Sequence, residues 1–351
     1  MSHLLARLRI RALGVAARLV PAPTPFMLTG PGSSIELARL IADRGARSVL
    51  VVTDQVLVEL KVVAPVLNAL KAAGLAVTVF SEVEPDPTIA IVMAGIEQLR
   101  ASGATAVLAV GGGSPIDAAK AMIACHASGR RPQDLDGYFK VRTPVVPFFA
   151  IPTTAGSGSE VTVAAVVSDP GAGRKFAIVD NKLVPAAIAL DPNLMVGLPP
   201  QVTAATGMDA FTHAIESYLS TLATPKTQAL SIAAARAIFR ELPRACEDGR
   251  NIDARQSLAV ASCLAGLAFT KACAGGGARD LPGADVPVGR RLRERRAASG
   301  WPSHGRGDET SLTRDRSKSR EERDLSHGIV CPHPCPVPRT ATRRPPGQSV
   351  P

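Results

Sequence analysis

The chain has 351 residues, enough for two domains with sizeable cores, and its formal net charge is +10. The charge does not indicate a nucleic-acid partner, because residues 279–351 alone carry a net charge of +6 and the other 278 residues only +4. Aromatic residues make up 3% of the chain, which is too few for a surface that stacks nucleic-acid bases. No run of about 20 apolar residues occurs, so we expect no membrane span.

Residues 1–22 are expected to be an amphipathic extension, since four arginines alternate there with apolar residues and no acid precedes Glu36. One interpretation is a mitochondrial-type presequence, and the other is a surface helix that packs on the following domain. We favour the surface helix, because no Ser-rich stretch or cleavage-like boundary follows.

Apolar and helical segments then alternate along the chain. The apolar runs at residues 48–54, 76–80 and 106–110 are typical of buried parallel strands. Helical stretches at about residues 57–73 and 89–102 lie between them. This alternation predicts a parallel sheet with helices on both faces.

The third predicted strand runs directly into Gly111, Gly112, Gly113 and Ser114, at the carboxyl end of a strand, where α/β folds bind ligands. Glycines let the backbone approach a pyrophosphate closely, and the amides at the start of a following helix attract its charge. The alternative is a tight turn with Ser114 as N-cap and Pro115 as the first helical residue. Three consecutive glycines exceed what such a turn requires, so we interpret the segment as a phosphate-binding loop.

A second loop of small residues, at 152–160, follows another apolar strand at residues 148–151. Its hydroxyls and free amides could line the ribose or nicotinamide end of a dinucleotide. Asp54, at the end of the first strand, could bond a ribose diol and repel a 2′-phosphate, which favours NAD over NADP. The alternative for Asp54 is the N-cap of a helix.

From residue 200 to about residue 270 the pattern is helical and Ala-rich, which marks a domain boundary. Asp209 and His213 are four residues apart there, so on a helix they project from one face. A carboxylate oxygen and an imidazole nitrogen in this arrangement can bind one divalent transition metal. The alternative is a capping acid with a satisfied histidine nearby. Two ligands do not hold such an ion, and no further histidine occurs before His304.

Six cysteines show no paired spacing in the globular part of the chain. Cys263 and Cys273 lie in an apolar Ala/Leu stretch and are expected to be buried thiols of a reducing compartment, so we expect a cytoplasmic protein. The segment Cys-Pro-His-Pro-Cys at residues 331–335 could form a small metal knot. We interpret it as an accident of composition, because its surroundings are Pro-rich and of low order.

Residues 111–120, 152–160 and 207–218 carry, in this order, motifs that resemble those of the iron-containing (group III) alcohol dehydrogenase family. The likeness covers roughly residues 23–270. It implies an N-terminal dinucleotide-binding domain and a C-terminal all-helical domain, with metal and substrate in the cleft between them. It also implies NAD(P)-linked interconversion of a small-molecule alcohol and its aldehyde or ketone, and a homodimer.

The resemblance also implies a set of site residues. The cofactor would be NAD, with NADP as the alternative, and the metal Fe²⁺, with Zn²⁺ or another divalent ion as the alternative. No catalytic residue beyond the metal site is implied. The cofactor contacts would be Gly112, Gly113, Ser114, Thr153, Thr154, Ser157 and Lys175, and the metal ligands Asp209 and His213. Asp54 at the strand end, and Gly111 and Asp117 of the glycine-rich segment, are further candidate cofactor contacts.

The chain departs from the family pattern near residue 274. Family members continue with a third ligand histidine in a Gly-Ala-Val-His-like segment and a fourth further on, whereas this chain continues as Gly-Gly-Gly-Ala-Arg at residues 275–279. Codons for residues 275–282, read one base later, can encode Gly-Ala-Val-His-Ala-Ile-Ser. We therefore hypothesise a frameshift near residues 274–277.

The predicted fold is an α/β domain with a parallel sheet, followed by a truncated all-helical domain and a largely disordered tail. Two functions stay open: a metal-dependent alcohol dehydrogenase that needs the missing ligands, and a non-catalytic nucleotide-binding remnant. Maleylacetate reductases and polyol dehydrogenases are competitors within the first class. The expected parts are the extension over residues 1–22, the α/β dinucleotide-binding domain over 23–200, the partial helical metal-binding domain over 201–274 and the Arg/Pro-rich tail over 275–351.

Overall fold

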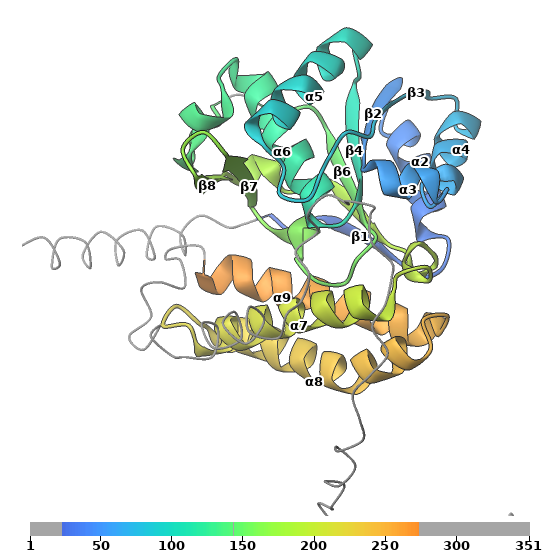
Figure 1. The fold of residues 1–351 in the computed structure, drawn as a ribbon, viewed down its shortest axis with the longest axis vertical. Coiled ribbons are helices and arrows are strands. Elements are labelled where there is room, and N and C mark those ends of the chain that lie inside the picture. The colour runs from blue at the N-terminus through green and yellow to red at the C-terminus, as the bar shows by residue number, and fades with distance from the viewer. Residues whose placement is uncertain (1–22, 143, 274–351) are drawn as a thin grey trace, which may run out of the picture. The chain divides into compact units, whose positions relative to one another are not determined.

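The computed structural model describes residues 23–142 and 144–273 (Figure 1). Several predictions lie outside the described residues and are not tested by the structure. They are the N-terminal extension, the departure from the family at residue 274, the histidines after His213, the Cys-Pro-His-Pro-Cys segment and the tail.

A six-stranded sheet forms the centre of the α/β part, with strand order β1-β9-β6-β4-β2-β3. Every neighbouring pair in this sheet is parallel, as the alternation of strands and helices predicted. The edge strand β1 and its neighbour β9, of four residues each, were not predicted. The strands are β1 (Phe26–Thr29), β2 (Ser48–Val52), β3 (Ala76–Phe80), β4 (Ala106–Gly111), β6 (Phe148–Pro152) and β9 (Ala187–Leu190).

Helices cover both faces of the sheet, and the side chains of β2 show how. Val49 and Val51 belong to a core cluster that includes side chains of α2 (Ser33–Asp43) and α4 (Ala64–Ala72). Leu50 and Val52 point the other way, into a cluster with α5 (Ile89–Ser102) and α6 (Gly113–Ser128). Successive strand residues face opposite sides, so one apolar run serves two cores.

The helix predicted at residues 57–73 is wrong in one respect, because two helices occupy this region. The short α3 (Gln55–Glu59) ends before Lys61, which has a φ of 58°, and α4 begins at Ala64. Pro65 lies in the first turn of α4. Proline disfavours helical backbone at the preceding residue and cannot donate a backbone hydrogen bond, so it breaks the predicted continuous helix.

A second, three-stranded sheet has the order β5-β8-β7 and was not predicted. Its core is the antiparallel hairpin of β7 (Ala164–Asp169) and β8 (Arg174–Val179), to which the two-residue β5 (Gly137–Tyr138) adds in parallel. Four short 3₁₀ turns complete the α/β part of the described chain: η1 (Pro132–Leu135), η2 (Ser159–Val161), η3 (Asn181–Leu183) and η4 (Pro192–Met195).

Three long helices follow, α7 (Pro200–Leu219), α8 (Pro225–Glu247) and α9 (Ile252–Cys273), and they pack on one another (Figure 1). Gly207 allows the close packing of α7 on α8, because a Cβ there would lie 2.4 Å from a methyl of Leu242. The helical pattern predicted up to about residue 270 is therefore confirmed. Among the helices of the described ranges, none is both long and apolar enough to cross a membrane.

Candidate functional site

Two loops meet at the carboxyl edge of the parallel sheet. The strands β4 and β6 are neighbours, and Gly111 at the end of β4 is the register partner of Pro152 at the end of β6. The backbone N–H of Thr153 donates to the carbonyl of Gly111 over 2.9 Å. The loop at residues 153–158 therefore starts beside the glycine loop.

Close packing restricts Gly113 more than Gly112, because a contact of 3.4 Å is an ordinary van der Waals distance and one of 3.0 Å is not. A Cβ at Gly113 would lie 3.0 Å from the Ser157 hydroxyl oxygen, and a Cβ at Gly112 would lie 3.4 Å from that of Thr154. Gly111 has a φ of 155°, which side-chain-bearing residues rarely adopt. The structure thus brings together most of the predicted cofactor contacts of the two loops.

The helix α6 starts at Gly113, with Gly112 as its N-cap. The alternative interpretation of Ser114 as N-cap is therefore wrong, and no side chain of the described residues caps this N-terminus. The Ser114 hydroxyl instead accepts a 3.3 Å hydrogen bond from the backbone N–H of Asp86. The amides and the dipole of α6 are thus available to an anion at this end of the helix.

Lys175 on β8 reaches the same region through Asp86. Its ammonium lies 2.6 Å from the Asp86 carboxylate, and both side chains are more than half exposed. Asp86 has a φ of 61°, an uncommon backbone conformation for this residue type. Asp86 was not predicted as a site residue, although the turn-forming sequence around it signals a loop.

Two predicted cofactor contacts make other interactions in the structure. Asp54 caps α3, since its carboxylate accepts from the backbone N–H of Leu57 over 2.9 Å. The carboxylate of Asp117 accepts from the backbone N–H of Val166 on β7 over 3.2 Å, and burial raises its pKa. The cofactor roles of both residues stay predictions.

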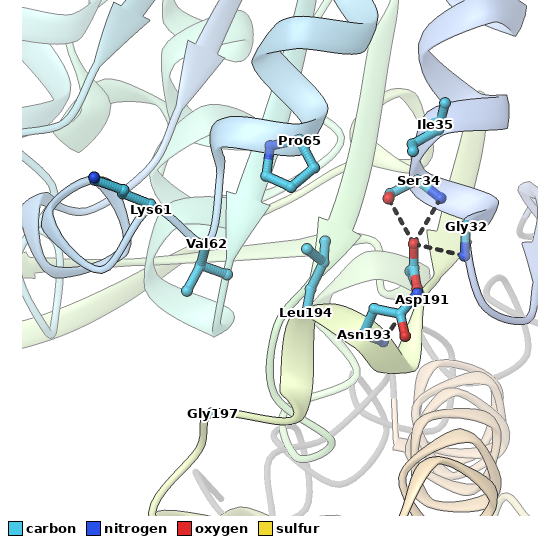
Figure 2. A pocket seen from close by; sticks show the side chains of 10 residues that line it. All are labelled: Gly32, Ser34, Ile35, Lys61, Val62, Pro65, Asp191, Asn193, Leu194 and Gly197. Carbon is cyan, nitrogen blue, oxygen red and sulfur yellow. Dashed lines mark hydrogen bonds between the residues drawn. The ribbon is translucent and has the colours of Figure 1, made fainter. Parts of the chain in front are cut away.

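A cavity of about 280 Å³ lies beside the N-terminus of α2 (Figure 2). The carboxylate of the buried Asp191, which directly follows β9, accepts hydrogen bonds at this N-terminus. One oxygen accepts from the backbone N–H groups of Gly32 (3.1 Å) and Ser34 (3.2 Å) and from the Ser34 hydroxyl (2.6 Å). The other accepts from the backbone N–H of Asn193 over 3.1 Å. The donors that an anionic ligand would need at α2 are therefore already used by the protein.

The predicted metal ligands lie on α7. Asp209 is exposed, and the ring of His213 packs against Phe269 of α9 with a centroid distance of 4.8 Å. The Nδ1 atom of His213 is buried and has no partner among the described residues. Over the same residues, no group of three His, Cys, Asp or Glu side chains could hold a metal ion. Asp209 and His213 are thus two possible metal donors without a third beside them in the described part of the chain.

The 153–158 loop also contacts the helices. A Cβ at Gly158 would lie 2.8 Å from the Cα of Gly266 on α9, and a Cβ at Gly156 would lie 2.7 Å from the Cβ of Thr206 on α7. Next to this contact, burial raises the pKa of Glu160 to about 7. Glu160 and the fully buried Lys120 were not predicted as site residues, since a charged residue in a sequence is normally exposed.

Residues 23–192 match the model of a family described as iron-containing alcohol dehydrogenase. Residues 203–277 match the C-terminal model of the Fe-containing alcohol dehydrogenase family. The second match ends where the sequence departs from the expected pattern.

Among curated proteins, the chain is 40% identical over 245 residues to an NAD-dependent methanol dehydrogenase of Bacillus methanolicus, covering 70% of this chain and 64% of that protein. It is also 40% identical over 248 residues to the probable alcohol dehydrogenase EutG of Escherichia coli (strain K12), covering 71% and 63%. The chain thus spans less than two thirds of the length of these relatives.

Solved structures show the same likeness. An alcohol dehydrogenase from Oenococcus oeni superposes with a TM-score of 0.70 at 34% identity, covering 72% of this chain and 67% of that one. A 1,3-propanediol oxidoreductase superposes with a TM-score of 0.71 at 33% identity, covering 80% and 76%. The order of a parallel α/β part and a helical part agrees with these structures.

Proposed function

Because the chain belongs to the iron-containing alcohol dehydrogenase family, we propose that its function is that of a metal-dependent, NAD(P)-linked alcohol dehydrogenase. The reaction would interconvert a small alcohol and its aldehyde or ketone. The names of its relatives, which include methanol and 1-propanol dehydrogenases and a lactaldehyde reductase, favour a short-chain substrate. NAD is the favoured cofactor, and a homodimer and a cytoplasmic location are further expectations from the sequence.

One observation carries the proposal: no side chain of residues 23–142 and 144–273 caps the α6 N-terminus, which lies against a hydroxyl-rich loop at the carboxyl edge of a parallel sheet. The backbone of Gly112 and Gly113 would hold a pyrophosphate there. Thr153, Thr154 and Ser157 would orient the rest of the dinucleotide, and Lys175 would add a positive charge. The protein thereby fixes the position of the nicotinamide, which carries the redox chemistry.

The two candidate metal ligands are of the residue types that the family uses, but they are fewer than a metal site needs. Asp209 and His213 are suitable ligands for Fe²⁺ or Zn²⁺, and the buried nitrogen of His213, which has no partner in the described part of the chain, supports such a role. When bound, the metal would act as a Lewis acid on the substrate oxygen. The described residues offer no third ligand, so we propose that turnover requires ligands from beyond residue 273.

The alternative is a nucleotide-binding remnant that does not catalyse the reaction. It is favoured by the sequence after residue 274, which replaces the expected histidine segment with a Gly-Gly-Gly-Ala-Arg stretch. The coding DNA for residues 273–279 tests the proposed frameshift. If the alternative frame does not continue as a helical, His-containing domain, the frameshift hypothesis fails.

Two measurements on the full chain distinguish the functions. Calorimetric titration with NAD and with ADP-ribose reports dinucleotide binding, and metal analysis combined with NAD reduction by methanol, ethanol, 1-propanol and 1,3-propanediol reports the reaction. Binding together with bound iron and turnover supports the dehydrogenase. Binding without metal or turnover supports the remnant, and no dinucleotide binding contradicts both.

A further inference from the structure

Lys120 is a fully buried lysine on α6, the helix whose N-terminus would hold the pyrophosphate. It follows Gly113 by seven residues, so its Cα lies about 10 Å further along the helix. Its ammonium donates to the backbone carbonyls of Ser159 (2.6 Å), Thr162 (2.7 Å) and Ala164 (2.9 Å). A fourth hydrogen bond reaches the Thr162 hydroxyl over 3.1 Å. One side chain thus organises six consecutive residues of another segment.

That segment begins where the 153–158 loop ends. The start of the loop is fixed by the hydrogen bond from Thr153 to Gly111, and its end is fixed by the acceptors of Lys120. Between these two anchors Gly156 and Gly158 contact the helices α7 and α9 through their backbone alone, since neither residue has a side chain. The position of Ser157 against Gly113 therefore depends on both anchors.

The burial of Lys120 is unfavourable by itself. Burial lowers its pKa to about 8, and a charge in the protein interior costs free energy unless it is paired and hydrogen-bonded. Asp117 and Glu160 compensate part of this charge. A methionine of similar length would fill the space without that cost, but it could not hold three carbonyls at hydrogen-bond distance. The specific contribution of the ammonium is therefore the geometry of the segment that it binds.

We propose that Lys120 is a positioning residue for dinucleotide binding, whose ammonium holds the end of the 153–158 loop against α6. Through this contact it keeps Thr154 and Ser157 beside the glycine loop, while its own side chain does not touch the cofactor. The inference rests on the proposed function, because it assigns Lys120 to the same dinucleotide site.

The test compares Lys120→Met and Lys120→Gln with the matched control Arg255→Met. Arg255 is also a buried cation, 2% exposed, but its guanidinium holds the carbonyls of Gly249 and Leu198 and the hydroxyl of Thr203 in the helical part. The dissociation constant of ADP-ribose is measured by calorimetry on the full chain, at a temperature where circular dichroism shows each variant to be folded.

Lys120→Met is expected to raise the dissociation constant at least tenfold. Lys120→Gln keeps two N–H donors and is expected to raise it about threefold, so that partial rescue follows the number of donors. Arg255→Met is expected to lower the melting temperature and to leave the dissociation constant within twofold of the wild type. Where Lys120→Met does not fold, the comparison of Lys120→Gln with Arg255→Met decides the question.

Two results would overturn the inference in distinguishable ways. If folded Lys120 variants bind ADP-ribose as tightly as the wild type, Lys120 has no positioning role, and the proposed function stands. If the wild type itself does not bind ADP-ribose, the proposed dinucleotide site fails and the role of Lys120 fails with it.

Discussion

Two helix N-termini at the carboxyl edge of the sheet, those of α2 and α6, differ in what occupies them. Both α2 and α6 follow a strand and begin in a Gly-Ser sequence, at Gly32-Ser33 and Gly113-Ser114. At α2 the buried carboxylate of Asp191 accepts three hydrogen bonds from the first turn. At α6 no side chain of the described residues caps the first turn.

The difference shows that a glycine-rich turn before a helix is not enough to make an anion site. A carboxylate of the same protein that accepts hydrogen bonds from the backbone N–H groups of the first turn prevents an anion from binding there. Where no side chain accepts from these N–H groups, an anionic ligand can do so. On this basis we assign the dinucleotide to α6 and a structural role to α2.

The largest effect is expected when the N-terminus of α6 receives a capping carboxylate like the one at α2. Gly112→Asp places an acid at the N-cap, where the φ of −74° suits any residue. We expect the ADP-ribose dissociation constant to rise at least 100-fold, because the new carboxylate caps the amides and repels the phosphates. Calorimetry measures this change.

Gly112→Ser is the matched control, since it caps the helix without a charge. It should weaken binding about fivefold and should leave the fold as stable as the wild type. Tight ADP-ribose binding by Gly112→Asp would show that the pyrophosphate lies elsewhere.

The opposite change removes the carboxylate that caps the N-terminus of α2. Asp191→Ala removes the acceptor of Gly32, Ser34 and Asn193, and we expect the free energy of unfolding to fall by about 2–3 kcal/mol. Asp191→Asn keeps one acceptor oxygen and should lose roughly half as much. Urea unfolding measures both, and equal stability of Asp191→Ala and the wild type would contradict the structural role of α2.

A third prediction concerns Glu160, the buried acid next to the Lys120 ammonium of α6. Burial raises the pKa of Glu160 from the ordinary 4.5 to about 7, although the nearby Lys120 ammonium acts in the opposite direction. The folded state then binds the proton more tightly than the unfolded state does. The stability that this provides is complete below about pH 4.5 and is lost as the pH rises through 7.

Between pH 5 and pH 8 we therefore expect Glu160 to lower the free energy of unfolding by on the order of 2 kcal/mol. Glu160→Gln should remove this slope, because an amide does not titrate. Urea unfolding at several pH values checks it, and a slope that persists in Glu160→Gln would assign the effect to another group.

The smallest expected effect comes from Ser114, whose hydroxyl accepts from Asp86 at the edge of the α6 site. Ser114→Ala removes one partly exposed hydrogen bond, worth about 0.5 kcal/mol, so we expect ADP-ribose to bind two- to threefold more weakly. Ser34→Ala at α2 is the matched control and should leave the dissociation constant unchanged. Equal effects of the two variants would remove the distinction between the two N-termini.

The α6 site could be predicted from the sequence because its signals are local. An apolar run, three glycines and a helical stretch follow one another at residues 106–120, and the structure places them as expected. The capping of the α2 N-terminus by Asp191 could not be predicted in this way, because Asp191 lies 159 residues from Gly32 along the chain. The same holds for Lys120, whose acceptors lie about 40 residues away.

Other differences between the predicted and the observed structure have local physical causes. Pro65 divides a helix that apolar periodicity alone made continuous, and Asp54 takes the capping role that was its alternative interpretation. The hairpin of β7 and β8 is partly exposed, so its residues lack the continuous apolar pattern that identified the central strands. The metal half-site was predictable in its spacing but not in its completion, because the expected segment lies outside the described residues.

Amide hydrogen exchange of the full chain with and without ADP-ribose tests the central claim most directly, because it reads both N-termini in one experiment. We predict that ADP-ribose slows exchange in peptides covering residues 111–118 and 153–158 and leaves residues 30–36 unchanged. Protection at residues 30–36 without protection at 111–118, or no protection in either region, would contradict the assignment of the dinucleotide to α6.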